Sequence, residues 1–189
     1  VEEMAFTTGN AAGDQLSVQL VGPSPDAKTS VAVTVKDGGW RLRSNEPKTV
    51  ALDSKGMKIT FKVENGKVAA YLDGRSAPTV TDSTLRLHWE GTRYYLPESS
   101  KKTYVDVAGT HGSYRHGRLE ITVKSGKINI VNNLLLNTEY LYGIAEMPSS
   151  WGEKGPASLE AQAIAARNYA ASKFFDSAGK RKPVTSSCR

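Results

Sequence analysis

Hydrophobic and polar residues alternate over several short stretches in the first 135 residues. Clear examples are Gln15 to Val21, Val31 to Val35 and Arg118 to Val123. A period of two residues is typical of a β-strand with one buried face. Further strands are expected over residues 39–43, 58–63, 67–72, 85–91, 93–96, 103–109 and 127–133. This part of the chain is therefore predicted to form a series of short strands.

Turn residues connect several of these strands. Asn65-Gly66 lies between residues 58–63 and 67–72, and Ser125-Gly126 lies between the last two predicted strands. An Asn-Gly step favours a tight hairpin turn, because both residues tolerate positive φ. We expect a hairpin at each of these two steps and a linker over residues 76–82.

The pattern changes to helical spacing after Asn137. A first helix is expected to end near Met147, because Pro148 lacks a donor N–H and disfavours helical geometry in the residue before it. A second helix is expected to start at Pro156 and to run through an Ala-rich segment without internal Gly or Pro. The predicted fold class is therefore α+β, with a β-rich region followed by Ala-rich helices that pack on strands.

Three polar residues of this helical part are not explained by helix stability. Glu146 falls at a helix end, where the negative pole of the helix dipole disfavours a carboxylate. Gln162 and Arg167 interrupt the Ala-rich surface, and Arg167 has no carboxylate three or four residues away on its own helix. If this face packs inward, Arg167 needs an anion from elsewhere in the fold.

Composition and charge narrow the classes of partner. The chain has 189 residues, 39% hydrophobic content and a net charge of +6, and no run of residues is long and apolar enough to span a membrane. The charge favours anionic partners such as cell-wall polymers, phospholipid surfaces or nucleic acid. Nucleic acid is disfavoured because no basic-aromatic motif accompanies the charge. The single cysteine permits no internal disulfide.

Several isolated residues leave two interpretations open. Trp40 is either a strand residue of the core or a platform for a ligand, and His88 is interpreted as structural. His111 and His116 lie in a Gly-rich loop, but no carboxylate or thiol completes a metal-ligand set, so we predict no metal site. Tyrosine rings could stack on sugars or pack within the sheet, at positions Tyr94, Tyr95 and Tyr104.

The sequence EYLYGIAEMPSSW, followed by LEAQAIAARNYA, closely resembles the signature of the SpoIID/LytB family of stage II sporulation protein D and amidase-enhancer proteins. The resemblance is firm over residues 119–175. It implies a SpoIID/LytB-like catalytic domain at 83–189 that is incomplete at its C-terminus. The strand pattern of residues 1–82 is interpreted as a β-rich accessory region or as an N-terminal extension of the catalytic fold. It also implies a protein of the cell wall or the extracellular space, whose signal peptide is expected to be removed or to lie outside this sequence.

The resemblance assigns roles to individual residues. Sporulation members are lytic transglycosylases with one catalytic glutamate, and the family's E-M-P motif places that glutamate at Glu146. Gln162 and Arg167 match the A-Q-A-x-A-A-R run and are expected near the substrate cleft. Trp151 is expected beneath the loop or against a sugar.

The sequence also departs from the family pattern. Many members have two more residues before the glutamate and a lysine where Glu160 stands. Some members bind zinc, but Cys188 lacks the matching partners here, so neither zinc nor any other cofactor is expected. The leading hypothesis is cleavage of peptidoglycan glycan strands. The alternative is a non-catalytic wall-binding protein that enhances a cell-wall amidase.

Overall fold

The computed structural model describes residues 15–24, 27–45, 48–95, 101–110 and 113–135, together with positions 139, 161, 164, 165 and 169. Most of the described residues lie in β-strands. The strands are β1 (Gln15–Val21), β2 (Ser30–Lys36), β3 (Trp40–Arg43), β4 (Thr49–Asp53), β5 (Lys58–Glu64), β6 (Lys67–Leu72), β7 (Val80–Asp82), β8 (Thr84–Trp89), β9 (Tyr104–Val107), β10 (Ser113–Tyr114), β11 (Arg118–Lys124) and β12 (Lys127–Leu135).

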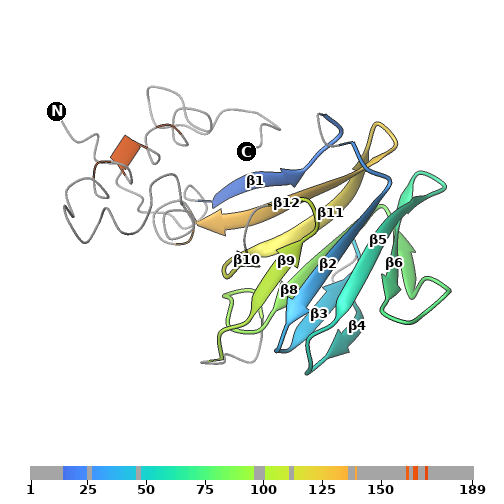
Figure 1. Cartoon of the computed structure of the whole chain (residues 1–189), viewed down its shortest axis with the longest axis horizontal. Coiled ribbons are helices and arrows are strands. Elements are labelled where there is room, and N and C mark those ends of the chain that lie inside the picture. The colour runs from blue at the N-terminus through green and yellow to red at the C-terminus, as the bar shows by residue number, and fades with distance from the viewer. Residues whose placement is uncertain are drawn as a thin grey trace. The chain divides into compact units, whose positions relative to one another are not determined.

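These strands form two antiparallel sheets of six strands each (Figure 1). The first sheet has the order β1-β12-β11-β8-β3-β4, and the second sheet has the order β10-β9-β2-β5-β6-β7. Many neighbours are far apart in sequence, such as β3 beside β8 and β2 beside β9. The fold is therefore held by long-range pairing rather than by consecutive hairpins alone.

One hydrophobic core lies between the two sheets. Alternate residues of each strand point into it, as a two-residue period requires. The first sheet contributes Trp40, Leu42, Leu85, Leu87, Trp89, Leu119, Ile121, Ile128 and Ile130, and the second sheet contributes Val31, Val33, Val35, Ile59, Phe61, Val68, Ala70, Val105 and Val107. The two apolar faces bury each other, so the described part is a β-sandwich.

Both predicted hairpins are confirmed. Asn65 and Gly66 have φ angles of 50° and 73° between β5 and β6, and Ser125 and Gly126 have φ angles of 51° and 69° between β11 and β12. Positive φ at both central residues is the geometry that suits the right-handed twist of paired strands. Local turn chemistry therefore sets the register of these two hairpins.

Other strand predictions need correction. The described residues of the predicted strand at 93–96 lie in turns, and the predicted linker at 76–82 contains β7, which pairs with β6. Strands β4 and β10 were not predicted. Strand β4 lies at the edge of the first sheet, and its residue Leu52 is 68% exposed. The hydrophobic residues of β4 therefore do not identify which face of the strand packs against the core.

The predicted α+β fold class is wrong for the described part of the chain. Among the described residues no helix packs on either sheet, because the second sheet occupies the face where a helix was expected. The predicted helices lie outside the described residues, apart from isolated positions such as Ala161 and Tyr169.

Residues before and after the predicted boundary at position 82 share both sheets. Hydrogen bonding between β3 and β8, and between β2 and β9, crosses that boundary. Residues Val18–Asn133 form one compact unit, and a second unit combines residues 1–17 with Leu134–Cys188. In the second unit, the Leu135 backbone N–H donates to the Glu139 carboxylate at 2.8 Å. The assignment of accessory and catalytic roles to 1–82 and 83–189 stays a prediction.

Candidate functional site

The four site residues predicted from the sequence are Glu146, Trp151, Gln162 and Arg167. All four lie outside the described residues. Their proximity to one another and their roles therefore stay predictions. The described residues contain two other polar surfaces, one on the outer face of each sheet.

The outer face of the first sheet carries a cluster of basic side chains, here called the arginine face. Alternation along three adjacent strands turns these side chains away from the core. The arginine face consists of Arg41 and Arg43 on β3, Arg86 and His88 on β8, and Arg118 and Glu120 on β11.

The register of the strands brings these residues together. Arg41 lies opposite His88, and Arg43 lies opposite Arg86. Arg86 also lies opposite Glu120, and its Nε atom is 3.1 Å from a Glu120 carboxylate oxygen. Sequence reasoning missed this cluster, although Arg41 and Arg43 alternate in one predicted strand and Arg86 and Arg118 lie on the polar side of two others. This placement was the available signal.

His88 is buried within the arginine face, with only 3% of its surface exposed. Its Nδ1 atom is 3.1 Å from the backbone oxygen of Tyr94. A carbonyl oxygen only accepts, so Nδ1 carries the hydrogen and Nε2 is the acceptor of the neutral ring. Among the described residues, no hydrogen-bond partner reaches the buried Nε2.

The surroundings of His88 favour its neutral form. Burial lowers its pKa to about 4, and the positive charge of Arg118, with smaller effects from Arg43 and Arg41, acts in the same direction. The hydrogen bond to the Tyr94 oxygen opposes this shift. His88 therefore adds no charge to the arginine face at neutral pH.

Two tyrosines of the turn after β8 hold arginine side chains. The Tyr94 ring centroid is 4.7 Å from the guanidinium carbon of Arg118 and 4.1 Å from that of Arg93, and Arg41 lies 5.3 Å from the Tyr95 ring. These are cation–π contacts, which attract a cation to the ring face. Of the interpretations left open for Tyr94 and Tyr95, strand packing is wrong, because both lie in a turn.

The outer face of the second sheet has a surface groove with a cavity volume of about 380 Å³. It is lined by Ala32, Thr34, Asp106, Val107, Ala108, Gly109, Thr110 and Ser113. Hydroxyl groups and one carboxylate on a small concave surface can form hydrogen bonds with a polar ligand. Gly109, Thr110 and Ser113 belong to the Gly-rich loop noted in the sequence.

Asp106 in this groove is suited to binding rather than to proton donation. Burial raises its pKa, but the hydrogen bonds from Lys36 and Ser113 outweigh burial, and the net shift is downward. The Lys36 Nζ atom lies 2.6 Å from Asp106. A general acid at neutral pH needs a raised pKa, so Asp106 does not replace Glu146 as a candidate.

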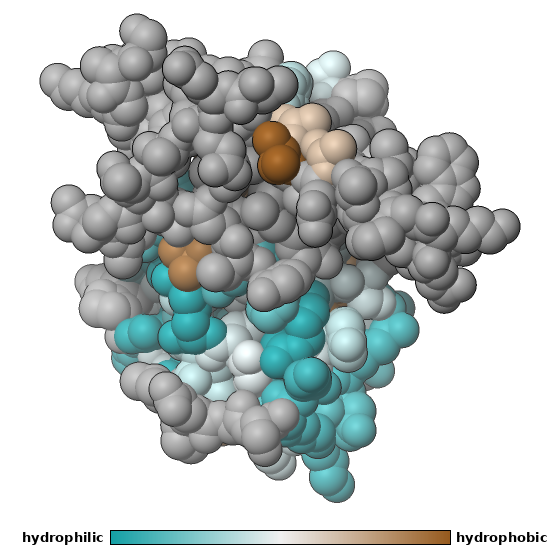
Figure 2. Space-filling model, turned by 90° about the vertical axis from the view of Figure 1, so that its left-hand side faces the viewer, coloured by the Kyte–Doolittle hydropathy of each residue, from teal (hydrophilic) through white to brown (hydrophobic). Residues whose placement is uncertain are grey.

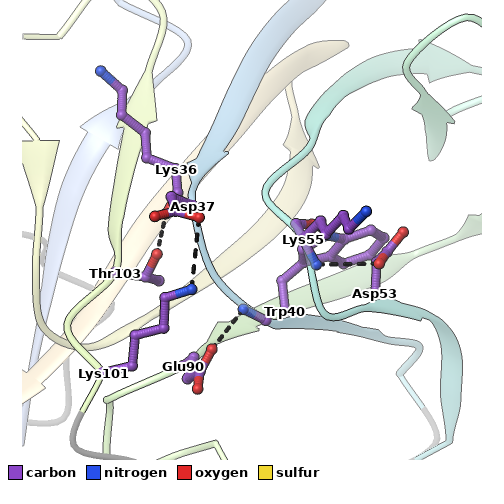
Figure 3. A network of polar contacts seen from close by, with 9 residues as sticks. Lys36, Asp37, Trp40, Asp53, Lys55, Glu90, Lys101 and Thr103 are labelled. Carbon is purple, nitrogen blue, oxygen red and sulfur yellow. Dashed lines mark hydrogen bonds and ion pairs between the residues drawn. The ribbon is translucent and has the colours of Figure 1, made fainter.

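A separate polar network anchors the turn between β2 and β3 (Figure 3). The Trp40 indole N–H donates to the Lys55 backbone oxygen at 3.0 Å, and the Gly39 N–H donates to the Glu90 carboxylate at 2.8 Å. Trp40 is fully buried. The core interpretation of Trp40 is therefore confirmed, and its one polar atom is used within the fold.

Among the described residues, no group of three or more His, Cys, Asp or Glu side chains could hold a metal ion. His116 is described, whereas His111 lies outside the described residues. No helix of this part of the chain has the length and apolar character needed to cross a membrane.

The surface visible in Figure 2 is mainly hydrophilic where its residues are described, and hydrophobic positions there are few. Leu52, Tyr104, Ile164 and Tyr169 are the large hydrophobic residues exposed in the described part. This surface chemistry suits polar or charged partners better than apolar ones.

Comparison with known proteins adds one finding. No curated protein and no solved structure matches the chain. Residues 124–188 match the model of the SpoIID family, described as Stage II sporulation protein, which confirms the resemblance seen in the sequence. The match contains all four predicted site residues, and it supports a cell-wall-related function in broad terms. The similarity to the SpoIID family therefore starts at the last residue of β11 and covers residues 124–188.

Proposed function

We propose that this protein cleaves the glycan strands of peptidoglycan by a lytic transglycosylase mechanism, with Glu146 as the acid/base residue. The observation that carries this proposal is the SpoIID match over residues 124–188, which contains Glu146 within its E-M-P motif. Glu146 is also a residue that helix stability does not explain.

The chemistry needs one carboxyl group. Protonated Glu146 donates its proton to the glycosidic oxygen while the bond from C1 to that oxygen breaks. The 6-hydroxyl oxygen of the same sugar then bonds to C1 and closes an anhydro ring. The resulting Glu146 carboxylate takes the proton of that hydroxyl, so the residue returns to its starting state. No water, metal or cofactor is consumed.

The residues of the Ala-rich segment are proposed to hold the substrate. Gln162 provides an amide that can donate to and accept from sugar hydroxyls. Arg167 provides a planar fork that fits a carboxylate. Trp151 provides an aromatic surface for a sugar ring or for the loop after Glu146.

The test is mass spectrometry of products from purified peptidoglycan, both intact and stripped of its peptides. The full-length protein should release anhydro-sugar products, and Glu146→Gln should lower the rate by about 100-fold or more. Glu153→Gln is the matched control, because it removes a carboxylate seven residues away in the same segment. Anhydro products that persist at the same rate in Glu146→Gln would refute the assignment.

A second function is favoured by the described part of the chain. A β-sandwich with a basic outer face and a polar groove suits a non-catalytic protein that binds the cell wall and enhances an amidase. The assay is amidase activity on whole walls with and without this protein. If this function holds, the enhancement is unchanged in Glu146→Gln and no anhydro products form.

A further inference from the structure

We propose that the arginine face of the first sheet binds the oxyanion groups, carboxylate or phosphodiester, of an anionic cell-wall polymer. This inference rests on the wall-related role above, but it does not depend on the chemistry of Glu146. It concerns β3, β8 and β11, which lie before residues 124–188 except for the last residue of β11.

The first argument is the strand register. Arg43 lies directly opposite Arg86, and like charges in that position destabilise a sheet. Arg118 lies one residue before Leu119, whose partner on β8 is Leu87, so Arg118 is level with His88 on the neighbouring strand. Four of the six side chains on the arginine face are arginines and one is a glutamate. This arrangement gathers positive charge on one face of the sheet, and positive charge attracts anions.

The second argument is how Arg118 is held. Its guanidinium lies 4.7 Å from the Tyr94 ring centroid, and its buried Nε atom has no hydrogen-bond partner among the described residues. A carboxylate would fix the guanidinium and cancel its charge. An aromatic ring fixes it and leaves the charge available. The side chain is therefore ordered before an anion arrives, which lowers the entropic cost of binding.

The third argument is His88. This ring lies level with Arg118 and opposite Arg41, and it is neutral, so it does not add to the repulsion between them. Its Nε2 atom is a buried acceptor without a partner among the described residues. A buried acceptor of this kind requires a donor. The neutral ring therefore leaves the positive charge of the neighbouring arginines unopposed by a second charge of its own.

The polymeric nature of the ligand follows from the spacing of the charges. Neighbouring strands lie about 4.8 Å apart, so arginines on β3, β8 and β11 extend over roughly 10 Å. A chain with repeated anionic groups can contact several of them at once. Both carboxylated glycans and polyol phosphate chains have repeated anions and free hydroxyls, and the two are distinguished by experiment.

The experiment measures the affinity of the full chain for soluble polymers at two salt concentrations. The probes are polygalacturonate, which carries carboxylates, poly(glycerol phosphate), which carries phosphodiesters, and single-stranded DNA. Arg118→Gln should weaken binding of the preferred wall-type polymer about tenfold, because a charge-assisted hydrogen-bond donor is lost. It should also reduce the salt dependence of binding.

The matched control is Lys62→Gln. Lys62 lies on the outer face of the second sheet, with its Nζ atom 4.5 Å from the Tyr71 ring centroid. The Lys62→Gln substitution therefore removes the same charge and the same kind of contact as Arg118→Gln. The polymer affinity of Lys62→Gln should stay within about twofold of the parent, because surface charges away from a site are largely screened. Equal losses in both variants would show non-specific attraction and overturn the site.

Two further outcomes have defined meanings. Tighter, Arg118-dependent binding of DNA than of either wall-type polymer would overturn the assignment to the cell wall. Arg118→Lys keeps the charge without the planar fork and should recover part of the affinity, which shows that a loss in Arg118→Gln is not a folding defect. Binding of the soluble polymers should be unchanged in Glu146→Gln, so the Glu146 mechanism and this inference are tested by separate measurements.

Discussion

The two sheets of the sandwich share one core but have different outer faces. On the first sheet, arginines of three strands lie side by side, and tyrosines of a turn hold their guanidinium groups. On the second sheet, charges occur as local pairs, such as Lys36 with Asp106, beside a polar groove. The inner faces are equally apolar.

This difference separates what the fold needs from what a ligand needs. Opposite charges placed side by side satisfy each other and require nothing from solution. Like charges placed side by side repel each other and attract anions. The outer face of the first sheet therefore favours anions at the place where arginines of three neighbouring strands meet.

The largest predicted effect tests whether the two sheets are one folding unit. Phe61→Ala removes a fully buried ring of the second sheet and should lower the free energy of unfolding by about 3–5 kcal/mol. Trp40 and Trp89 report on the first sheet. In a Trp151→Phe background, the unfolding transitions followed by tryptophan fluorescence and by far-UV circular dichroism should coincide. Phe61→Ala should shift both transitions by the same amount. A fluorescence transition that does not shift would show that the sheets unfold independently.

The next prediction concerns acid and the arginine face. The unfolded chain binds a proton at His88 near pH 6.5, whereas burial beside Arg118, Arg43 and Arg41 lowers the folded pKa to about 4. Between these values the unfolded state binds more protons, so stability falls as the pH falls from 6.5 to 4 and changes no further below 4 through this residue. The expected decrease in the free energy of unfolding over this pH range is about 2–3 kcal/mol.

The measurement is the free energy of unfolding by denaturant at pH 7, 5.5 and 4.5. The free energy of unfolding of His88→Gln should change little over this pH range, because the glutamine amide does not titrate. The amide can still donate to the Tyr94 oxygen. His116→Gln serves as the control and should keep the slope of the parent. A parent protein with equal stability at pH 7 and 4.5 would contradict the burial of a neutral His88.

The strands and hairpins could be predicted from the sequence because their signals are local. Alternation gave the bounds of β1 and β6 correctly, and Asn65-Gly66 and Ser125-Gly126 identified two hairpins. Alternation does not reveal which strands are neighbours. The prediction that helices cover the strands failed because the apolar face of one sheet is covered by the other sheet.

The sequence signal for the arginine face was incomplete for the same reason. Arg41 and His88 are 47 positions apart, and only the pairing of β3 with β8 brings them together. Alternation places His88 on the polar side of its strand, yet it is buried, and its ring lies 5.8 Å from that of Tyr94 in the turn after β8. Glu146, Gln162 and Arg167 were found by a family pattern instead, which reports chemistry without reporting geometry.

The smallest predicted effects compare one ion pair from each outer face. Lys36→Gln removes the pair with Asp106, in which both side chains are partly exposed, and should cost about 0.5 kcal/mol. Glu120→Gln should cost about 1 kcal/mol, because the Arg86–Glu120 pair is less exposed and the remaining arginines lose a counter-charge.

Added sulfate distinguishes the two cases. Salt screens the exposed Lys36–Asp106 pair, so the parent and Lys36→Gln should converge in melting temperature as salt is added. In Glu120→Gln, sulfate should raise the melting temperature more than an equal ionic strength of chloride does, because a doubly charged oxyanion can bind among the arginines. Identical responses of Glu120→Gln to sulfate and chloride would show that the arginine face has no particular affinity for oxyanions. The two outer faces would then differ in charge pattern but not in capacity to bind a ligand.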